Sequence, residues 1–185
     1  TAALVVAYLL GISLKEAARY LNSFQGAARR FDILGERHGI MVVDDYAHHP
    51  TEIKATLTAA CQTGRRVLAV FQPHRYTRTA YFMQEFAASF DSCHHLIITD
   101  IYSVGEEPLL GVTSQALAEK IKKRGTCTVQ TLPREKVVPF LLQKTREGDL
   151  VLTMGAGDVW ELGHSFWEEL QKLDAKDIIL AREIL

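Results

Sequence analysis

The feature that most constrains the fold of this chain is an alternation, from Phe31 onward, of short apolar runs with longer amphipathic segments. The runs at 67–71 and 150–152 are continuously apolar, which is typical of strands covered on both faces. The alternation predicts β-α-β units. We therefore expect an α/β fold with a Rossmann-like, mostly parallel sheet of about six strands and helices on both faces.

The expected elements follow from the apolar runs and from the proline and glycine residues that separate them. Pro50 and Pro133 fall in the first turns of their helices, and Ser114 is expected to cap another. The strands are expected near 31–34, 40–44, 66–72, 96–99, 127–131 and 149–154, and the helices near 50–62, 79–90, 114–124, 133–146 and 158–172.

The first part of the chain reads as terminal helices of a neighbouring domain. Residues 2–10 are apolar almost all round, as in a helix buried within a larger body. Ser13 and Glu16 have the spacing of a capping box that opens a second helix, and Gly26 is expected to end this unit. The chain also lacks an initiator methionine, so we expect it to be a fragment of a longer protein.

Composition narrows the classes of partner. The 185 residues carry 22 acidic and 21 basic side chains, a formal charge of -1, which argues against nucleic acid or an anionic membrane as a main partner. No apolar run reaches the length of a membrane span. Cys61, Cys93 and Cys127 are too far apart for a zinc motif, so a reducing, cytoplasmic location is expected.

Polar segments follow four of the expected strands. In an open α/β sheet, ligands bind beyond the carboxyl ends of the strands, so these segments are expected to meet at one rim. The segments are 44–50 (DDYAHHP), 73–79 (PHRYTRT), 100–103 (DIYS) and 154–158 (MGAGD).

Each segment has more than one interpretation. The first could be turn chemistry before a helix; His48 and His49 could suggest a metal, but adjacent histidines do not project together and no third ligand follows. Arg75 and Arg78 could form a fork for carboxylate or phosphate, or be a solvated surface pair. The glycines at 155–157 could admit a phosphate or make a simple tight turn.

Motifs for complete catalysis are missing from this sequence. It contains no G-x-x-x-x-G-K-[ST] phosphate loop and no G-x-S-x-G nucleophile elbow. The chain is therefore not expected to hydrolyse ATP or form a covalent intermediate by itself.

Taken together, the motifs closely resemble the C-terminal part of the Mur ligase family, and in particular its alanine-adding members, over roughly residues 1 to 165. The strings are FQGAARRF at 24–31, DDYAHHPTE at 44–52, FQPHRYTRT at 71–79, GEEP at 105–108 and MGAGD at 154–158. The resemblance implies a bacterial, cytoplasmic ligase of cell-wall precursor synthesis. Such enzymes use ATP and Mg²⁺ to join L-alanine to UDP-N-acetylmuramate through an acyl phosphate.

The resemblance also implies a division of the chain. Residues 1–34 would be the last helices and linker of the central ATPase domain, 35–173 the amino-acid-binding C-terminal domain, and 174–185 a tail or linker. The phosphate loop, most of the ATP and Mg²⁺ site and the UDP-sugar domain would lie upstream in the same protein. The isolated chain is then expected to be inactive.

The site residues implied by the resemblance form two groups. Arg30, Asp45 and Tyr46 match positions on the ATP side, near the phosphates, the ribose and the nucleotide cleft respectively. The amino-acid side would be formed by Tyr46, His48, His74, Arg75 and Arg78, of which His48, Arg75 and Arg78 are the expected catalytic residues. Their task would be to position the substrates, since no general base is identified.

Two other hypotheses remain open from the sequence. The chain could be a stand-alone, non-catalytic α/β module that binds a nucleotide or anion, although the apolar segment at 2–10 argues against this. It could also belong to a bifunctional protein in which a second enzyme follows Leu185.

Overall fold

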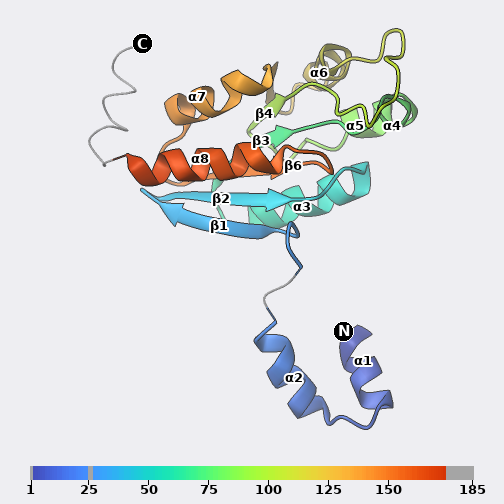
Figure 1. Ribbon diagram of the computed structural model, residues 1–185, viewed down its shortest axis with the longest axis vertical. Helices are drawn as coiled ribbons and strands as arrows, with labels where there is room; N and C mark the ends of the chain where they lie inside the picture. The colour runs from blue at the N-terminus through green and yellow to red at the C-terminus, as the bar shows by residue number, and fades with distance from the viewer. Residues whose placement is uncertain (1, 25–26, 174–185) are drawn as a thin grey trace.

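The computed structural model describes residues 2–24 and 27–173, and its centre is a six-stranded sheet (Figure 1). The strand order is β1-β2-β6-β3-β4-β5, with β1 antiparallel to β2 and every other neighbouring pair parallel. The predicted mostly parallel α/β sheet is thus confirmed. The strands are β1 (Asp32–Arg37), β2 (Ile40–Asp45), β3 (Arg66–Phe71), β4 (His95–Ile98), β5 (Thr128–Thr131) and β6 (Asp149–Met154).

Helices cover both faces of the sheet, as predicted. One core cluster packs α3 (Pro50–Gln62), α5 (Met83–Ala87) and α6 (Ser114–Lys122) against one face. A second packs α7 (Arg134–Lys144) and α8 (Trp160–Lys172) against the other. The central strands β3 and β6 contribute side chains to both clusters, which explains why their sequences are continuously apolar.

The antiparallel strand β1 is joined to β2 by a tight hairpin. His38 and Gly39 form the connection, and both have positive φ, at 51° and 70°, as a type I′ turn requires. The strand begins at Asp32, so residues 32–34, which precede the boundary expected at residue 35, are part of the sheet. The expected tail at 174–185 and the stop at Gly26 lie outside the described residues.

One predicted helix was wrong in its form. In place of a single helix over 79–90, the structure has α4 (Tyr76–Tyr81) and α5, separated at Phe82. Phe82 leaves helical geometry (φ −101°, ψ 19°), and its ring packs edge-on against His49 with centroids 4.6 Å apart. The packing of one aromatic side chain on the start of α3 therefore accompanies the break.

A second correction concerns the cap of α6. Thr113, not Ser114, is the N-cap, because the Thr113 hydroxyl accepts a hydrogen bond from the Ala116 N–H at 3.0 Å. The Ser114 hydroxyl instead donates to the Thr99 carbonyl at 2.6 Å and is buried. Similarly, Pro133 is the N-cap of α7 and precedes its first turn.

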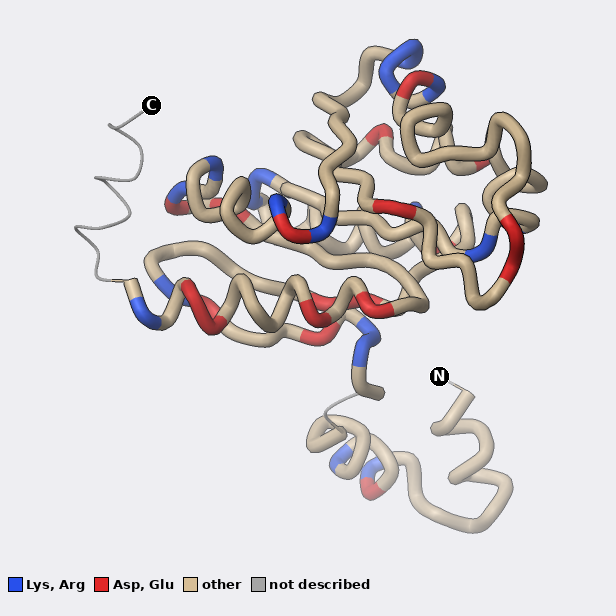
Figure 2. The backbone as a smooth tube through the Cα atoms, turned by 45° about the horizontal axis from the view of Figure 1, so that its top comes forward, with Lys and Arg blue, Asp and Glu red and all other residues tan. Residues whose placement is uncertain are grey.

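The first two helices lie apart from the sheet in both views of the backbone (Figures 1 and 2). They are α1 (Ala2–Leu9) and α2 (Leu14–Asn22), and Ser13 caps α2 by accepting from the Glu16 N–H at 3.2 Å. No residue of α1 is buried, although the helix is apolar and uncharged. Within the described ranges, no helix is both long and apolar enough to cross a membrane.

Candidate functional site

The four polar segments predicted to converge do lie on neighbouring strands. They follow β2, β6, β3 and β4, which are adjacent in that order. Backbone hydrogen bonds continue past the strand ends, from the Gly155 N–H to the Asp45 carbonyl (3.2 Å) and from the Gln72 N–H to the Met154 carbonyl (3.0 Å). One rim at the carboxyl edge of the sheet therefore carries all the candidate residues from Tyr46 to Arg78.

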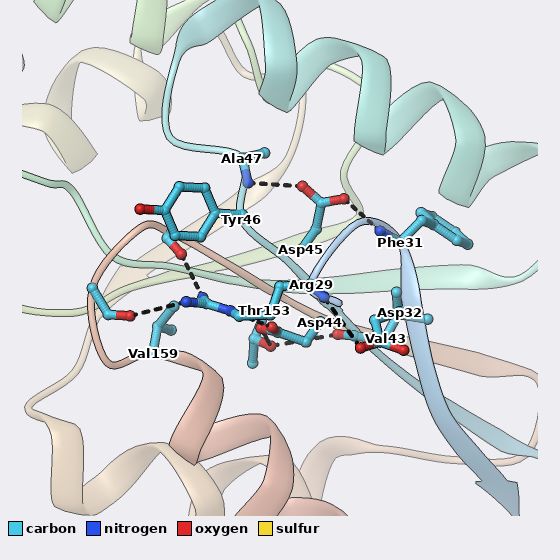
Figure 3. Close-up of polar contacts among 12 residues, drawn as sticks. Arg29, Phe31, Asp32, Val43, Asp44, Asp45, Tyr46, Ala47, Thr153 and Val159 are labelled. Carbon is cyan, nitrogen blue, oxygen red and sulfur yellow. Dashed lines mark hydrogen bonds and ion pairs between the residues drawn. The ribbon is translucent and has the colours of Figure 1, made fainter. Parts of the chain in front are cut away.

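Arg29 ties the segment before β1 to this rim (Figure 3). Its Nε lies 2.7 Å from Asp44 Oδ2, and its terminal nitrogens donate to the carbonyls of Gly155 (2.6 Å) and Gly157 (3.4 Å). Asp44 is 1% exposed, and its other oxygen accepts from the Thr153 hydroxyl at 2.7 Å. Arg29 and Asp44 thus hold β1, β2 and the turn after β6 together.

The predictions from sequence selected Arg30 and Asp45 and overlooked Arg29 and Asp44. Arg-Arg and Asp-Asp are adjacent pairs, and sequence gives no signal for which member points into the sheet. Arg30 is exposed, with its guanidinium carbon 5.8 Å from the centre of the Tyr46 ring, while that of Arg29 lies 5.0 Å from it. The ring of Tyr46 therefore lies within cation–π distance of both arginines.

Asp45 has a structural role in the chain itself (Figure 3). Its Oδ1 accepts from the Ala47 N–H and its Oδ2 from the Phe31 N–H, both at 2.7 Å, and the residue is 5% exposed. Each carboxylate oxygen has a second lone pair, so a ligand hydroxyl could still donate to it. The primary effect of Asp45 is to fix the loop that carries Tyr46.

The histidine pair opens α3. The His49 side chain accepts from the Thr51 N–H at 3.3 Å, and the carboxylate of Glu52 accepts from the backbone N–H groups of His48 (3.0 Å) and His49 (3.2 Å). Burial raises the pKa of Glu52, but these N–H groups and the nearby His48 lower it by more than burial raises it. The net shift is therefore downward. Among the described residues, no cluster of His, Cys, Asp or Glu is arranged to hold a metal ion.

His74 lies between the β2 and β4 segments. Its ring stacks on Tyr102 with centroids 5.7 Å apart and an interplanar angle of 16°, and the His48 ring is 6.0 Å away on another side. Burial, followed by the positive charge of Arg78, lowers the pKa of His74. The ring is therefore neutral near pH 7.

Two buried polar atoms at this place have no partner among the described residues: His74 Nδ1 and Arg78 Nη1. Buried donors and acceptors are nearly always hydrogen-bonded, so an unpaired guanidinium N–H is the kind of group that an anionic ligand completes. Arg75, Thr77, Arg78, Tyr81 and Phe82 line a cleft of about 340 Å³ beside it. The predicted arginine pair is thus brought to one cleft.

Arg75 and Arg78 differ in their surroundings. Arg75 Nε is 2.7 Å from Glu106 Oε1, whereas no ion pair forms on Arg78 within the part of the chain that the structure describes. Glu106 belongs to the GEEP string of the family resemblance, which assigned it no role. Tyr102 was likewise overlooked.

The turn at 155–157 fits the tight-turn interpretation. Its carbonyls are engaged by Arg29, and a side chain on Gly157 would collide with the ring of Tyr102 and the amide of Gln72. Gln72 also donates to Asp158 Oδ1 at 2.7 Å and accepts from the Val159 N–H at 3.2 Å. The absence of a side chain at Gly157 therefore allows β3, β6 and the Tyr102 loop to meet.

Comparison with known proteins finds relatives among the Mur ligases. The sequence profile of the family described as "Mur ligase, glutamate ligase domain" matches residues 29–157. The UDP-N-acetylmuramate–L-alanine ligase of Pelotomaculum thermopropionicum is 47% identical over 174 residues, covering 92% of this chain and 38% of the relative. The chain thus spans about two fifths of the length of the relatives it matches.

Solved structures agree on the fold. The UDP-N-acetylmuramate–alanine ligase of Thermotoga maritima has a TM-score of 0.74 at 25% identity, covering 91% of this chain and 36% of that one. A murein peptide ligase from Psychrobacter arcticus has a TM-score of 0.66 at 25% identity, covering 93% and 36%. The two structures are equally identical to this chain in sequence, and the alanine ligase has the higher TM-score.

Proposed function

Since the chain belongs to the Mur ligase family, we propose that it is the amino-acid-binding domain of an ATP-dependent ligase that joins L-alanine to UDP-N-acetylmuramate. The observation that carries the proposal is the cluster of His48, His74, Arg75 and Arg78 at the carboxyl edge of the sheet, in a chain 47% identical to an alanine ligase. In this reaction the sugar carboxylate takes the γ-phosphoryl group of ATP and ADP leaves; the alanine amine then attacks the carbonyl of the acyl phosphate, inorganic phosphate leaves, and the nitrogen loses a proton.

The residues of this chain would act by positioning. The unpaired N–H of Arg78 and the terminal nitrogens of Arg75 would take the carboxylate of alanine, which leaves the amine free to face the acyl phosphate. Holding the two reacting groups at attack distance lowers the barrier by several kcal/mol, on the order of the cost of bringing them together in solution. His48 and neutral His74 would form the wall of this pocket.

On the nucleotide side, exposed Arg30 would contact the phosphates and Tyr46 would offer an aromatic face. Asp45 would accept from the ribose through the lone pairs that its backbone contacts leave over. Phosphate-loop and Mg²⁺ chemistry would come from the rest of the ligase, since this chain spans only about two fifths of the relatives it matches.

The helices α1 and α2 fit this arrangement as part of the ATPase domain. α1 leaves Val5, Val6, Tyr8 and Leu9 more than half exposed, an apolar surface that upstream residues of the same protein would cover. Of the residues 1–34 expected to be the helices and linker of that domain, the linker would end before β1, since the sheet of the amino-acid-binding domain begins at Asp32 and not at residue 35.

The test is phosphate release with UDP-N-acetylmuramate, ATP, Mg²⁺ and L-alanine, on this chain and on the protein extended to its natural N-terminus. Turnover that depends on alanine is expected only in the extended protein. A well-folded extended protein that uses a cell-wall peptide in place of alanine would assign it to the peptide ligases instead. Absence of turnover with either substrate would contradict the proposal.

A further inference from the structure

Glu106 lies on the loop between β4 and α6 and reaches across to the start of α4. Its Oε1 accepts from Arg75 Nε at 2.7 Å and from the Thr77 hydroxyl at 2.7 Å, and its Oε2 accepts from the Thr77 N–H at 3.0 Å. The side chain is 15% exposed. One carboxylate therefore engages the backbone and side chain of α4 together with the guanidinium of Arg75.

The same loop also holds the backbone of Arg75. The Arg75 N–H donates to the Tyr102 carbonyl at 2.8 Å, and His74 and Tyr102 form an isolated parallel β-bridge. Arg75 has φ 71°, a left-handed conformation that is strained for a residue with a side chain. A strained residue that is held at both its main chain and its side chain has a geometry that the fold imposes on it.

Glu106 contacts only one of the three guanidinium nitrogens of Arg75. Nε faces Glu106, the terminal nitrogens have no hydrogen-bond partner in the described ranges, and Arg75 lines the cleft together with Arg78. The backbone N–H and hydroxyl of Thr77, followed by Arg75, lower the pKa of Glu106 to about 2, so the carboxylate stays ionised at neutral pH. The pair presents a fixed hydrogen-bonding edge whose charge is largely balanced, beside the unbalanced charge of Arg78.

We propose that Glu106 is a positioning residue for the amino-acid substrate, acting through Arg75 to hold its terminal nitrogens toward the substrate carboxylate. The inference rests on the proposed function and deepens it. Arg78 would attract the substrate carboxylate through its uncompensated charge, and the Glu106–Arg75 pair would fix its orientation. Such a pair favours a substrate with an uncharged side chain, because Glu106 would repel a second carboxylate near Arg75.

The experiment compares Glu106→Gln with the wild type in the protein extended to its natural N-terminus, by steady-state kinetics with L-alanine and ATP varied separately. The amide removes the charge that fixes Arg75, so the KM for alanine is expected to rise about tenfold, while the KM for ATP and kcat change less than about twofold. Glu107→Gln is the matched control, because Glu107 is the exposed neighbour on the same loop. It is expected to leave all three constants unchanged.

A double-mutant cycle separates positioning from a merely structural role. In an Arg75→Ala background, Glu106→Gln is expected to change the alanine KM by less than about twofold, because the group through which it acts is gone. A further tenfold rise there would mean that Glu106 only supports the loop, and would overturn the inference. Thr77→Val is the second variant; it removes one donor to Glu106 and is expected to raise the alanine KM about threefold, above the twofold limit for no effect.

The failures of the two proposals are distinguishable. A wild-type protein that turns over with alanine, combined with an unchanged alanine KM in Glu106→Gln, overturns the role of Glu106 alone. If Glu106→Gln does not fold, an unchanged alanine KM in folded Thr77→Val has the same meaning. A folded wild-type protein without alanine-dependent turnover overturns the proposed function, and the role of Glu106 with it.

Discussion

Arg29 and Asp44 form an ion pair, with Nε 2.7 Å from Oδ2, in which the carboxylate is 1% exposed and the guanidinium 23% exposed. The pair joins residues on either side of the first strand, and through the carbonyls of Gly155 and Gly157 it reaches the turn after β6. The Tyr46 N–H also donates to the Arg29 carbonyl at 2.8 Å. Arg29 is therefore a structural residue of the rim, beside the loop that carries Tyr46.

Arg29→Ala is expected to lower the free energy of unfolding by about 3 kcal/mol, because it leaves Asp44 buried without its charge partner. Asp44→Asn should cost less, since Arg29 is partly solvated, and the double variant should cost less than the sum of the two. Urea unfolding of the three variants measures this. Lys172→Ala, which breaks an exposed pair with Glu169, is the control and should change stability by less than about 0.5 kcal/mol.

Gly157→Ala is expected to destabilise the chain by about 1–3 kcal/mol, because a methyl group there meets Tyr102 and Gln72 in a packed region. In the extended protein it should also weaken alanine use, since Tyr102 carries the stack with His74. Gly111→Ala is a suitable comparison: its φ is 76°, but the space around it is open, so only about 1 kcal/mol of backbone strain is expected. Equal losses in thermal unfolding would contradict the packing argument.

The lowered pKa of His74 predicts a pH dependence of stability. A histidine whose pKa is lower when folded than when unfolded binds fewer protons in the folded state, so stability falls as the pH decreases below about 6.5. His95, whose pKa is also lowered chiefly by burial, adds to the same trend. The free energy of unfolding, measured from pH 8 to pH 5, should decline less steeply in His74→Gln than in the wild type. An unchanged slope would argue against a neutral, buried His74.

Much of the fold is predictable from the sequence because the signals are local. The continuous apolar runs of β3 and β6 identify central strands, and Pro50 marks the start of α3 correctly. The break at Phe82 and the cap at Thr113 are not predictable in this way. Both depend on contacts with segments far along the chain, Phe82 with His49 and Ser114 with Thr99.

The candidate site divides in the same manner. The position of polar segments after strands correctly predicts that His48, His74 and Arg78 approach one another at the rim. Sequence does not reveal that Arg75 faces Glu106 while Arg78 has a buried N–H without a partner in the described residues, because that difference arises from the path of the β4–α6 loop. The assignment of individual roles therefore needs three-dimensional information.

That difference leads to a prediction about the two arginines. Arg78→Ala is expected to raise the alanine KM more than Arg75→Ala, by about tenfold or more, because Arg78 is the cation whose charge is not balanced by a neighbouring carboxylate. Both variants should leave the KM for ATP within about twofold of the wild type. Arg78→Lys should restore little, since an ammonium group cannot replace a planar, two-pronged donor. Arg124→Ala, which disrupts an exposed pair with Asp91, serves as a control for loss of a surface arginine. The measurement is steady-state kinetics of the extended protein. A larger rise in the alanine KM for Arg75→Ala than for Arg78→Ala would mean that Glu106 does not balance the charge of Arg75.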